Sequence, residues 1–129
     1  MEGYTMAYAD YVAIVDDDGS MRVSLARLLR IHGFESRTYP SASAFLSALP
    51  GAIPFCLIVD VNMPDMTGLD LQRELRKLGA QIPTIVITGV EDKNVVAKAK
   101  SLGADAFLYK PFTQAEIIAA LNGIAKKKN

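Results

Sequence analysis

The fold is decided by the stretch Phe55-Cys56-Leu57-Ile58-Val59-Asp60, in which five consecutive apolar residues end at one carboxylate. An uninterrupted apolar run of this length, rather than an alternating one, is typical of a strand that is buried on both faces. The run Thr84–Ile87 has the same character. Together they predict central strands of a parallel sheet that lies between two layers of helices.

Outward from these two runs, three further short runs predict strands, and helical stretches lie between all five. Ser36–Tyr39 is the most polar of them and is predicted to be an edge strand. Strand and helix alternate with short connections, which predicts parallel strands and right-handed crossovers. The expected fold is therefore an α/β, doubly wound, five-stranded parallel sheet of the (βα)5 type. The predicted strands are Tyr11–Val15, Ser36–Tyr39, Phe55–Val59, Thr84–Ile87 and Ala106–Tyr109.

The helices are predicted from apolar residues that recur at three- and four-residue spacing. Gly33, Gly79 and Gly103 follow three of them as stop signals. Thr113 and Glu116 form a capping-box pattern before the fifth. The expected faces are Met21, Leu25, Leu28, Leu29 and His32; Ala42–Leu49 after the cap Ser41; Leu71, Leu75 and Leu78; Val95, Val96, Ala99 and Leu102; and Ile117, Ile118, Leu121 and Ile124.

Length and composition exclude several classes of protein. The 129 residues correspond to one domain, in which half of the residues are apolar and 22% are charged. Fourteen basic and fourteen acidic residues balance, so no net charge favours nucleic acid or an anionic membrane. One cysteine excludes an internal disulfide, and no apolar run is long enough to span a membrane. We expect a cytoplasmic domain over residues 11–126, with an N-terminal extension (1–10) and a short tail (127–129).

Polar groups end four of the five predicted strands. In open parallel sheets, ligands bind beyond the carboxyl ends of the strands, where the strand order switches. Each group taken alone is an ordinary turn residue or helix cap, but the set at matched positions predicts a site. Its members are Asp16, Asp17 and Asp18; Asp60; Thr88 and Gly89; and Lys110 and Pro111.

The acidic residues of this set predict a metal site. Asp16, Asp17 and Asp60 are expected to lie within a few ångströms of one another, and two such charges about 4 Å apart repel by roughly 4 kcal/mol at an effective dielectric near 20. Oxygen ligands without His or Cys select a hard cation, and a shallow site with few carboxylates suits hydrated Mg²⁺, or Mn²⁺ in its place, better than Ca²⁺.

A metal beside a carboxylate, a lysine and a hydroxyl is a combination of groups suited to phosphoryl transfer. A carboxylate can attack phosphorus to form an aspartyl phosphate, while cations neutralise the phosphoryl oxygens. The sequence contains neither G-x-x-x-x-G-K-[ST] nor G-x-G-x-x-G, so no nucleotide cradle is predicted. The phosphoryl group is expected to arrive on another kind of donor.

At this point the sequence resembles the response-regulator receiver domains of bacterial two-component signalling, and most closely the FixJ-like receivers. The resemblance runs from about Tyr11 to Lys126, and its four motifs together are specific. It implies the flavodoxin-like strand order 2-1-3-4-5. The motifs are Ile14-Val15-Asp16-Asp17-Asp18, Asp60-Val61-Asn62-Met63-Pro64-Asp65-Met66-Thr67-Gly68, Val86-Ile87-Thr88-Gly89 and Lys110-Pro111-Phe112.

The resemblance also implies a role for each matching residue. Asp60 is the expected phosphorylation site. Mg²⁺ is expected to be held by Asp17, Asp60 and the backbone carbonyl of Asn62, with Asp16 assisting through water. Thr88 is the expected switch hydroxyl, Phe107 the switch aromatic, and Lys110 the cation that contacts the phosphate, across a cis Lys110–Pro111 bond.

Other polar residues have plainer interpretations. Asp18 is expected to lie in solvent or near a helix N-terminus, where a negative charge is favourable. His32 and Cys56 are expected to be structural. Lys126, Lys127 and Lys128 suit the C-terminal end of a helix rather than a nucleic-acid site.

Three functions remain open on the sequence. The first is a switch, not an enzyme, that accepts a phosphoryl group from a histidine kinase or phosphotransfer protein and at most assists its own slow dephosphorylation. Phosphorylation is then expected to change residues 92–102 and 106–126 and to favour a homodimer or an effector contact. The second is a true phosphatase, which would show multiple turnover and need a second acid or base. The third is an interaction module that is never phosphorylated. We expect either a stand-alone regulator or the receiver part of a longer protein.

Overall fold

Strands and helices alternate along the whole chain, as the sequence predicts. The computed structural model describes residues 8–89 and 93–128. In chain order the elements are β1 (Tyr8–Val15), α1 (Gly19–Ile31), β2 (Ser36–Tyr39), α2 (Ala42–Ala48), the 3-10 turn η1 (Leu49–Gly51), β3 (Ile53–Asp60), α3 (Gly68–Lys77), β4 (Thr84–Thr88), α4 (Lys93–Ser101), β5 (Ala104–Tyr109) and α5 (Gln114–Lys128).

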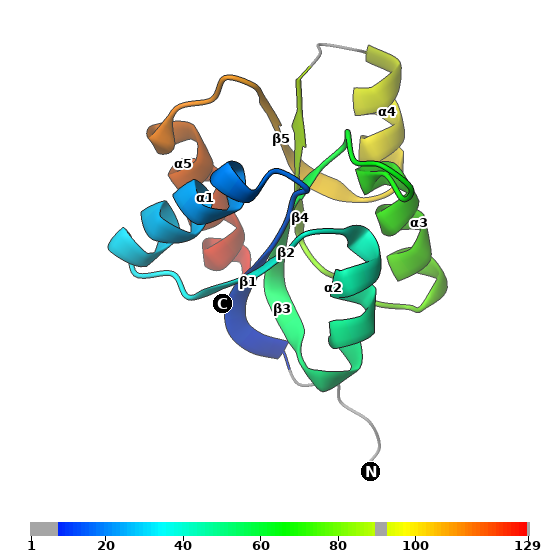
Figure 1. Ribbon diagram of the computed structural model, residues 1–129, viewed down its shortest axis with the longest axis horizontal. Helices are drawn as coiled ribbons and strands as arrows, with labels where there is room; N and C mark the ends of the chain where they lie inside the picture. Colours follow the sequence, from blue (N-terminus) through cyan, green and yellow to red (C-terminus); the bar gives the residue numbers. More distant parts are fainter. Residues whose placement is uncertain (1–7, 90–92, 129) are drawn as a thin grey trace.

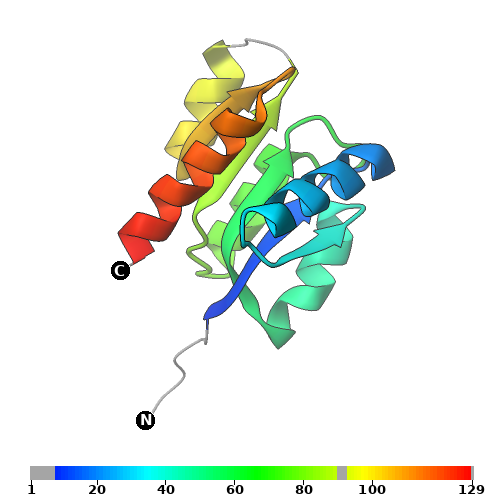
Figure 2. The same cartoon turned by 90° about the vertical axis from the view of Figure 1, so that its left-hand side faces the viewer.

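The strands form one parallel sheet in the order β2-β1-β3-β4-β5, which confirms the expected fold and strand order. Helices α1 and α5 cover one face of the sheet, and α2, α3 and α4 cover the other (Figures 1 and 2). β2 lies at one edge, as its polar sequence predicted, and β3 lies at the centre with all eight residues buried.

Two apolar clusters hold the layers together, because neighbouring residues of a strand point to opposite faces. On β1, Ala13 and Val15 pack toward α2, α3 and α4 with Phe45 and Leu71. Val12 and Ile14 pack toward α1 and α5 with residues such as Leu25, Leu29, Ile117 and Leu121. Both faces of the central strands are thereby removed from water, which is the reason for their uninterrupted apolar sequences.

Several boundaries differ from the sequence-based prediction. β1 begins at Tyr8 instead of Tyr11, and β3 begins at Ile53, with Pro54 near its start, where a proline is tolerated in a strand. Leu78 was predicted on the buried face of α3, but it is 61% exposed because the helix has already ended there. His32, predicted on the α1 face, is exposed at the C-cap. Asp92, the first residue of the predicted switch surface, lies outside the described residues.

The predicted helix ends are otherwise confirmed. Gly33, Gly79 and Gly103 all adopt positive φ (84°, 72° and 97°), the conformation in which glycine commonly ends a helix. The capping box at α5 is formed: Thr113 N donates to Glu116 Oε1 (2.8 Å) and Glu116 N donates to Thr113 Oγ1 (3.1 Å). Within residues 8–89 and 93–128, no helix is long and apolar enough to cross a membrane.

Candidate functional site

Asp60 is the last residue of β3, and both of its carboxylate oxygens have a partner. Oδ1 accepts a hydrogen bond from the backbone N–H of Asn62 (2.8 Å), and Oδ2 lies 2.5 Å from the Lys110 Nζ. Asp60 is only 3% exposed. A buried carboxylate needs such partners, because an unpaired buried charge is costly. Asp60 is thus held in a defined position at the carboxyl edge of the sheet.

The backbone explains why Asp60, Thr88 and Lys110 converge. The N–H of Val61 donates to the carbonyl of Ile87 (2.9 Å), so the ends of β3 and β4 are joined. The N–H of Lys110 donates to the carbonyl of Thr88 (2.9 Å), which joins the ends of β4 and β5. Thr88 is buried, and the Lys110–Pro111 bond is cis, as expected.

Asp16, at the end of β1, is buried with one carboxylate oxygen unsatisfied. Its Oδ1 accepts a hydrogen bond from the N–H of Asp18 (2.9 Å), whereas its Oδ2 has no hydrogen-bond partner among the described residues. Burial raises the pKa of Asp16, the Asp18 N–H opposes this, and the negative charges of Asp60 and Asp17 raise it further. Asp16 is therefore a buried carboxylate at the carboxyl end of β1 with one oxygen that no described residue satisfies.

Asp17 and Asn62 lie at the exposed rim of the same site. In the described part of the chain, no three acidic, histidine or cysteine side chains form a group close enough to hold a metal ion. The tight three-carboxylate cluster expected from the sequence is therefore not formed in this structure. Asp17, Asp60 and Lys110 are nevertheless close enough to Asp16 for their charges to act on it.

Lys110 compensates part of the negative charge at this edge. Burial alone would lower the pKa of Lys110, but the hydrogen bond and charge of Asp60, aided by Asp16 and Asp18, raise it above its ordinary value. Lys110 thus stays protonated at neutral pH. The Lys110 side chain is 33% exposed, so it reaches the buried Asp60 carboxylate from the solvent side.

The donor set fits a hard divalent cation. The candidate ligands are carboxylate and carbonyl oxygens, which hard cations prefer, and among the described residues the buried Asp16 Oδ2 has no partner, a place that a cation or its bound water would take. The exposed rim also leaves room for retained water molecules, which Mg²⁺ prefers.

The loop after Asp60 is packed tightly beneath the site. Met63 is buried, and Asp65 adopts a positive φ of 65°, which Asp tolerates better than most residues. A Cβ on Gly68 would lie 2.7 Å from the carbonyl oxygen of Asp60, so only glycine lets α3 begin this close. Thr67 and Asp70 cap the helix reciprocally.

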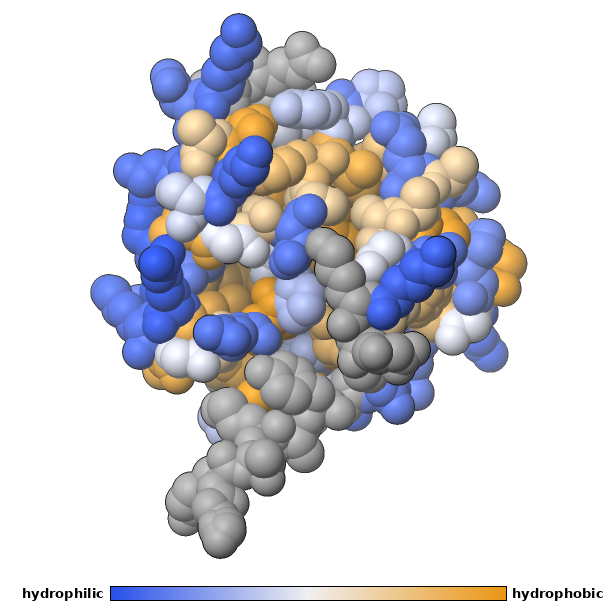
Figure 3. Space-filling view, turned by 180° about the vertical axis from the view of Figure 1, so that it is seen from behind, coloured by the Kyte–Doolittle hydropathy of each residue, from blue (hydrophilic) through white to orange (hydrophobic). Residues whose placement is uncertain are grey.

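Phe107 lies on β5, where it pairs with Val86 of β4. It is half-buried and packs against the cluster beneath α2, α3 and α4. Val95 and Val96 of α4 and Ala106 of β5 are also half-buried, and Tyr109 is 37% exposed. Figure 3 looks toward the β5 edge and shows apolar side chains among charged ones on this face.

The residues with plainer interpretations behave as the sequence indicated. Asp18 is the N-cap of α1 and accepts hydrogen bonds from Ser20 N and Met21 N. His32 Nδ1 lies 3.0 Å from the Leu28 carbonyl oxygen. Cys56 is buried, and burial raises the pKa of its thiol to about 12, which makes it inert.

One contact at the site was not foreseen. Arg22 Nη1 donates to the backbone carbonyl of Asp16 at 2.6 Å, across the first turn of α1. The only signal in the sequence was a basic residue soon after an acidic run, which is too common a pattern to assign a role.

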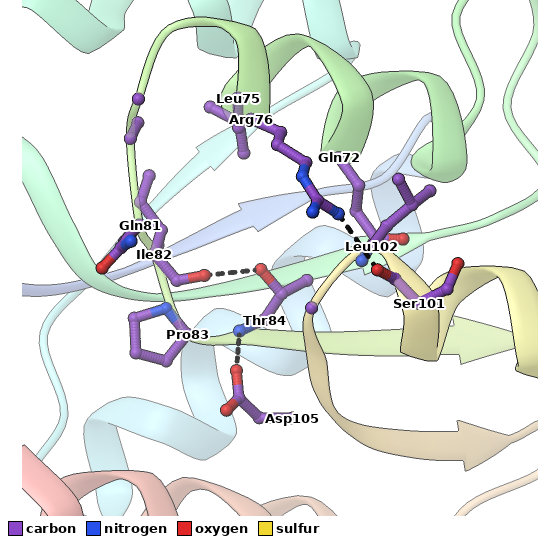
Figure 4. A pocket seen from close by; sticks show the side chains of 13 residues that line it. Gln72, Leu75, Arg76, Gln81, Ile82, Pro83, Thr84, Ser101, Leu102 and Asp105 are labelled. Atoms are coloured by element: carbon purple, nitrogen blue, oxygen red, sulfur yellow. Dashed lines mark hydrogen bonds between the residues drawn. The ribbon is translucent and has the colours of Figure 1, made fainter.

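An open pocket of about 610 Å³ lies at the other end of the sheet, between the carboxyl ends of α3 and α4 and the amino ends of β4 and β5. Figure 4 shows Arg76 extending to the Ser101 carbonyl (3.1 Å), and Thr84 between Ile82 and Asp105. The buried Gln72 also lines this pocket, and its Nε2 donates to the Ala99 carbonyl (3.1 Å). These bonds tie α3 to the carboxyl end of α4.

The arrangement at the Asp60 edge agrees with comparisons to known proteins. Residues 12–122 match the response regulator receiver domain. The chain belongs to the response regulator receiver family. This receiver is 41% identical to the response regulator protein TodT of Pseudomonas putida over 118 residues, which are 92% of this chain and 52% of TodT. It is 43% identical to the transcriptional regulatory protein FixJ of Rhizobium meliloti over 113 residues, 87% of this chain and 55% of FixJ. The receiver spans about half the length of these relatives.

Solved structures agree with this membership. The receiver resembles the FixJ-N crystal structure with a TM-score of 0.83 and 41% identity, covering 92% of this chain and 95% of that one. It resembles the Vibrio cholerae chemotaxis protein CheY4 with a TM-score of 0.83 and 28% identity, covering 92% and 99% of the two chains. The fold and the FixJ-like character expected from the motifs are both confirmed.

Proposed function

We propose that this receiver is a signalling switch that accepts a phosphoryl group on Asp60 from a histidine kinase or phosphotransfer protein. The observation that carries the proposal is the position of Asp60: a buried carboxylate at the end of the central strand, paired with Lys110 beside the unsatisfied Asp16. A structural ion pair alone would not require a second buried carboxylate next to it. The proposed receiver domain spans residues 11–126.

In the proposed step, a carboxylate oxygen of Asp60 forms a bond to phosphorus as the donor's P–N bond breaks. The electron pair of that bond stays on the leaving imidazole nitrogen, which takes up a proton from solvent. Lys110 exchanges part of its contact with the Asp60 carboxylate for the phosphoryl oxygens, whose charge it offsets. Thr88, whose backbone is hydrogen-bonded to that of Lys110, provides the hydroxyl that binds the phosphoryl group on Asp60.

Four groups would hold Mg²⁺ or Mn²⁺: the carboxylates of Asp17 and Asp60, the backbone carbonyl of Asn62, and Asp16 through water. When bound, the cation neutralises phosphoryl oxygens and thereby lowers the barrier to attack. Asp16 would not have to break a hydrogen bond at its Oδ2, since that oxygen has no partner in the described part of the chain. Asp17 is exposed at the rim, so its carboxylate can be ordered by a bound cation.

The output surface is proposed to be α4, β5 and α5. A phosphoryl group adds about −1.5 to −2 charge and three acceptor oxygens beside Thr88 and Lys110, which end β4 and β5. Thr88 then moves toward the phosphate and Phe107 fills the space that it leaves. The apolar side chains on this face are available to a second copy of the domain or to an effector.

Intact mass spectrometry tests the proposal. Incubation with a small acyl phosphate and Mg²⁺ should add one phosphoryl group, which is absent in Asp60→Asn and in excess chelator. Asp65→Asn, an exposed acid in the same loop, is the matched control and should remain fully competent. An adduct that persists in Asp60→Asn would overturn the assignment, and steady turnover of the donor without an adduct would favour a phosphatase.

A further inference from the structure

Arg22 contacts both neighbours of Asp17. Its side-chain Nη1 donates to the backbone carbonyl of Asp16 (2.6 Å), and its own backbone N–H donates to the carbonyl of Asp18 (3.0 Å). The guanidinium lies along the first turn of α1, where its Nη2 is 3.5 Å from the position of a Cβ on Gly19. The backbone bond is the ordinary first hydrogen bond of α1, so the contact that depends on the arginine side chain is the bond to the Asp16 carbonyl.

The other hydrogen bonds of this turn are made by Asp16 and Asp18, the two neighbours of Asp17. Asp16 N donates to the Tyr39 carbonyl (3.2 Å), and Asp16 Oδ1 accepts the Asp18 N–H (2.9 Å). Asp18 is committed to capping α1. The backbone of Asp17 is therefore held between Asp16 and Asp18, whose own backbone groups are hydrogen-bonded, and Arg22 provides the side-chain anchor on the Asp16 side.

Arginine suits this position for a chemical reason. Three consecutive carboxylates repel one another, and a guanidinium remains charged at every physiological pH. A hydrogen bond from a charged donor is roughly twice as strong as a neutral one. The Arg22–Asp16 bond thus holds the turn in one conformation and brings a positive charge to the acidic run.

We propose that Arg22 is a positioning residue for the cation site: it fixes the backbone turn that carries Asp17 and so lowers the cost of ordering that ligand. This inference rests on the proposed function, since it assigns Arg22 a role toward Mg²⁺. It does not make Arg22 a ligand or a phosphate contact.

Two variants separate hydrogen bonding from charge. Arg22→Met removes the donor and the charge, whereas Arg22→Lys keeps the charge and loses the planar fork. Arg27→Met is the matched control, because Arg27 is an exposed residue of the same helix and the change in charge is the same. Calorimetric titration with Mg²⁺ should show affinity about tenfold weaker in Arg22→Met, as is typical when a partner of a metal ligand is removed. The loss in Arg22→Lys should be smaller, and Arg27→Met should stay within about twofold of the wild type.

Amide exchange in chelator gives a readout that needs no metal. Exchange at the Asp18 N–H should be faster in Arg22→Met than in Arg27→Met, because the turn is released. Unchanged exchange would show that Arg22 does not hold the turn, and faster exchange with unchanged Mg²⁺ affinity would reduce Arg22 to a purely structural role. Equal losses of affinity in Arg22→Met and Arg27→Met would also overturn the proposal. A wild-type protein that binds no Mg²⁺ would instead refute the proposed function itself.

Discussion

Lys110 Nζ lies 2.5 Å from the Oδ2 of Asp60, a residue fifty positions earlier in the chain. The two groups differ in environment, because the Lys110 side chain is 33% exposed and the Asp60 side chain 3%. The lysine therefore compensates a buried charge from the solvent side, where it can shift toward a phosphoryl group without being extracted from the core.

Removing that compensation should destabilise the domain. Lys110→Met leaves the buried Asp60 carboxylate without its cation, and we expect the free energy of unfolding to fall by about 1–3 kcal/mol. Urea denaturation at neutral pH measures the loss. Lys126→Met, an exposed change of the same charge, should have little effect. Equal stability of the two variants would mean that Asp60 does not depend on Lys110.

Asp17 and Asp18 should have opposite phenotypes. Asp18→Ala removes the N-cap of α1 and should cost about 1 kcal/mol of stability while leaving Mg²⁺ affinity nearly intact. Asp17→Ala should weaken Mg²⁺ binding strongly and change stability little, since the side chain is exposed. Thermal unfolding measures the stability of both variants, and a Mg²⁺ titration measures their affinity. Equal losses of Mg²⁺ affinity in the two variants would mean that the cation site lies elsewhere.

Asp16→Asn should stabilise the metal-free domain, increasingly as pH rises. Burial raises the pKa of Asp16 in the folded state above its ordinary value of 3.8, and the charges of Asp60 and Asp17 add to the shift. A raised pKa means that the ionised form is less favourable in the folded state, so the wild type loses stability as pH rises through the folded pKa.

The increase in the free energy of unfolding caused by Asp16→Asn is therefore expected to be small below about pH 4 and of order 1 kcal/mol at pH 7. Denaturation in chelator across this range measures it, with Asp65→Asn as an exposed control. A gain of the same size at every pH would contradict the assigned cause.

Gly68 and Gly123 offer a matched pair of substitutions. A Cβ on Gly68 would lie 2.7 Å from the Asp60 carbonyl oxygen, and both the loop and α3 would have to shift. We expect Gly68→Ala to cost about 1–3 kcal/mol, as overpacking does, and to slow phosphorylation. In α5, a Cβ on Gly123 meets nothing within 4 Å, so Gly123→Ala should stabilise by up to about 1 kcal/mol. Chemical denaturation measures both changes, and a neutral Gly68→Ala would show that the loop beneath Asp60 can move.

Phosphorylation should change amide exchange in α4, β5 and α5. Within α4 the change should be larger at its amino end, because Gln72 and Arg76 tie the carboxyl end to α3. Exchange is measured with and without a phosphoryl mimic, and Asp60→Asn should show no change. If exchange altered only around Asp60, the switch would lack its proposed output surface.

The sequence alone predicted the α/β architecture, and it predicted which polar residues would lie at one edge of the sheet. Fully apolar runs such as Phe55–Val59 can only be buried on both faces, and alternation with helices makes the strands parallel. The carboxyl ends of parallel strands lie at one edge, so Asp16, Asp60, Thr88 and Lys110 were expected there before any contact was seen. Local signals, such as the glycines after helices and the Thr113–Glu116 cap, predicted helix ends for the same reason: they depend on neighbouring residues only.

Only the tertiary structure decided how those residues meet. Strand register and helix placement bring Lys110 to Asp60 and Arg22 back to Asp16. They also leave Asp16 Oδ2 without a partner among the described residues. The tertiary structure also showed that Asp17 lies at the exposed rim instead of in a tight cluster, and that Leu78 lies outside the core. A side chain's partner across fifty residues is set by the packing of the whole sheet, which no local pattern encodes.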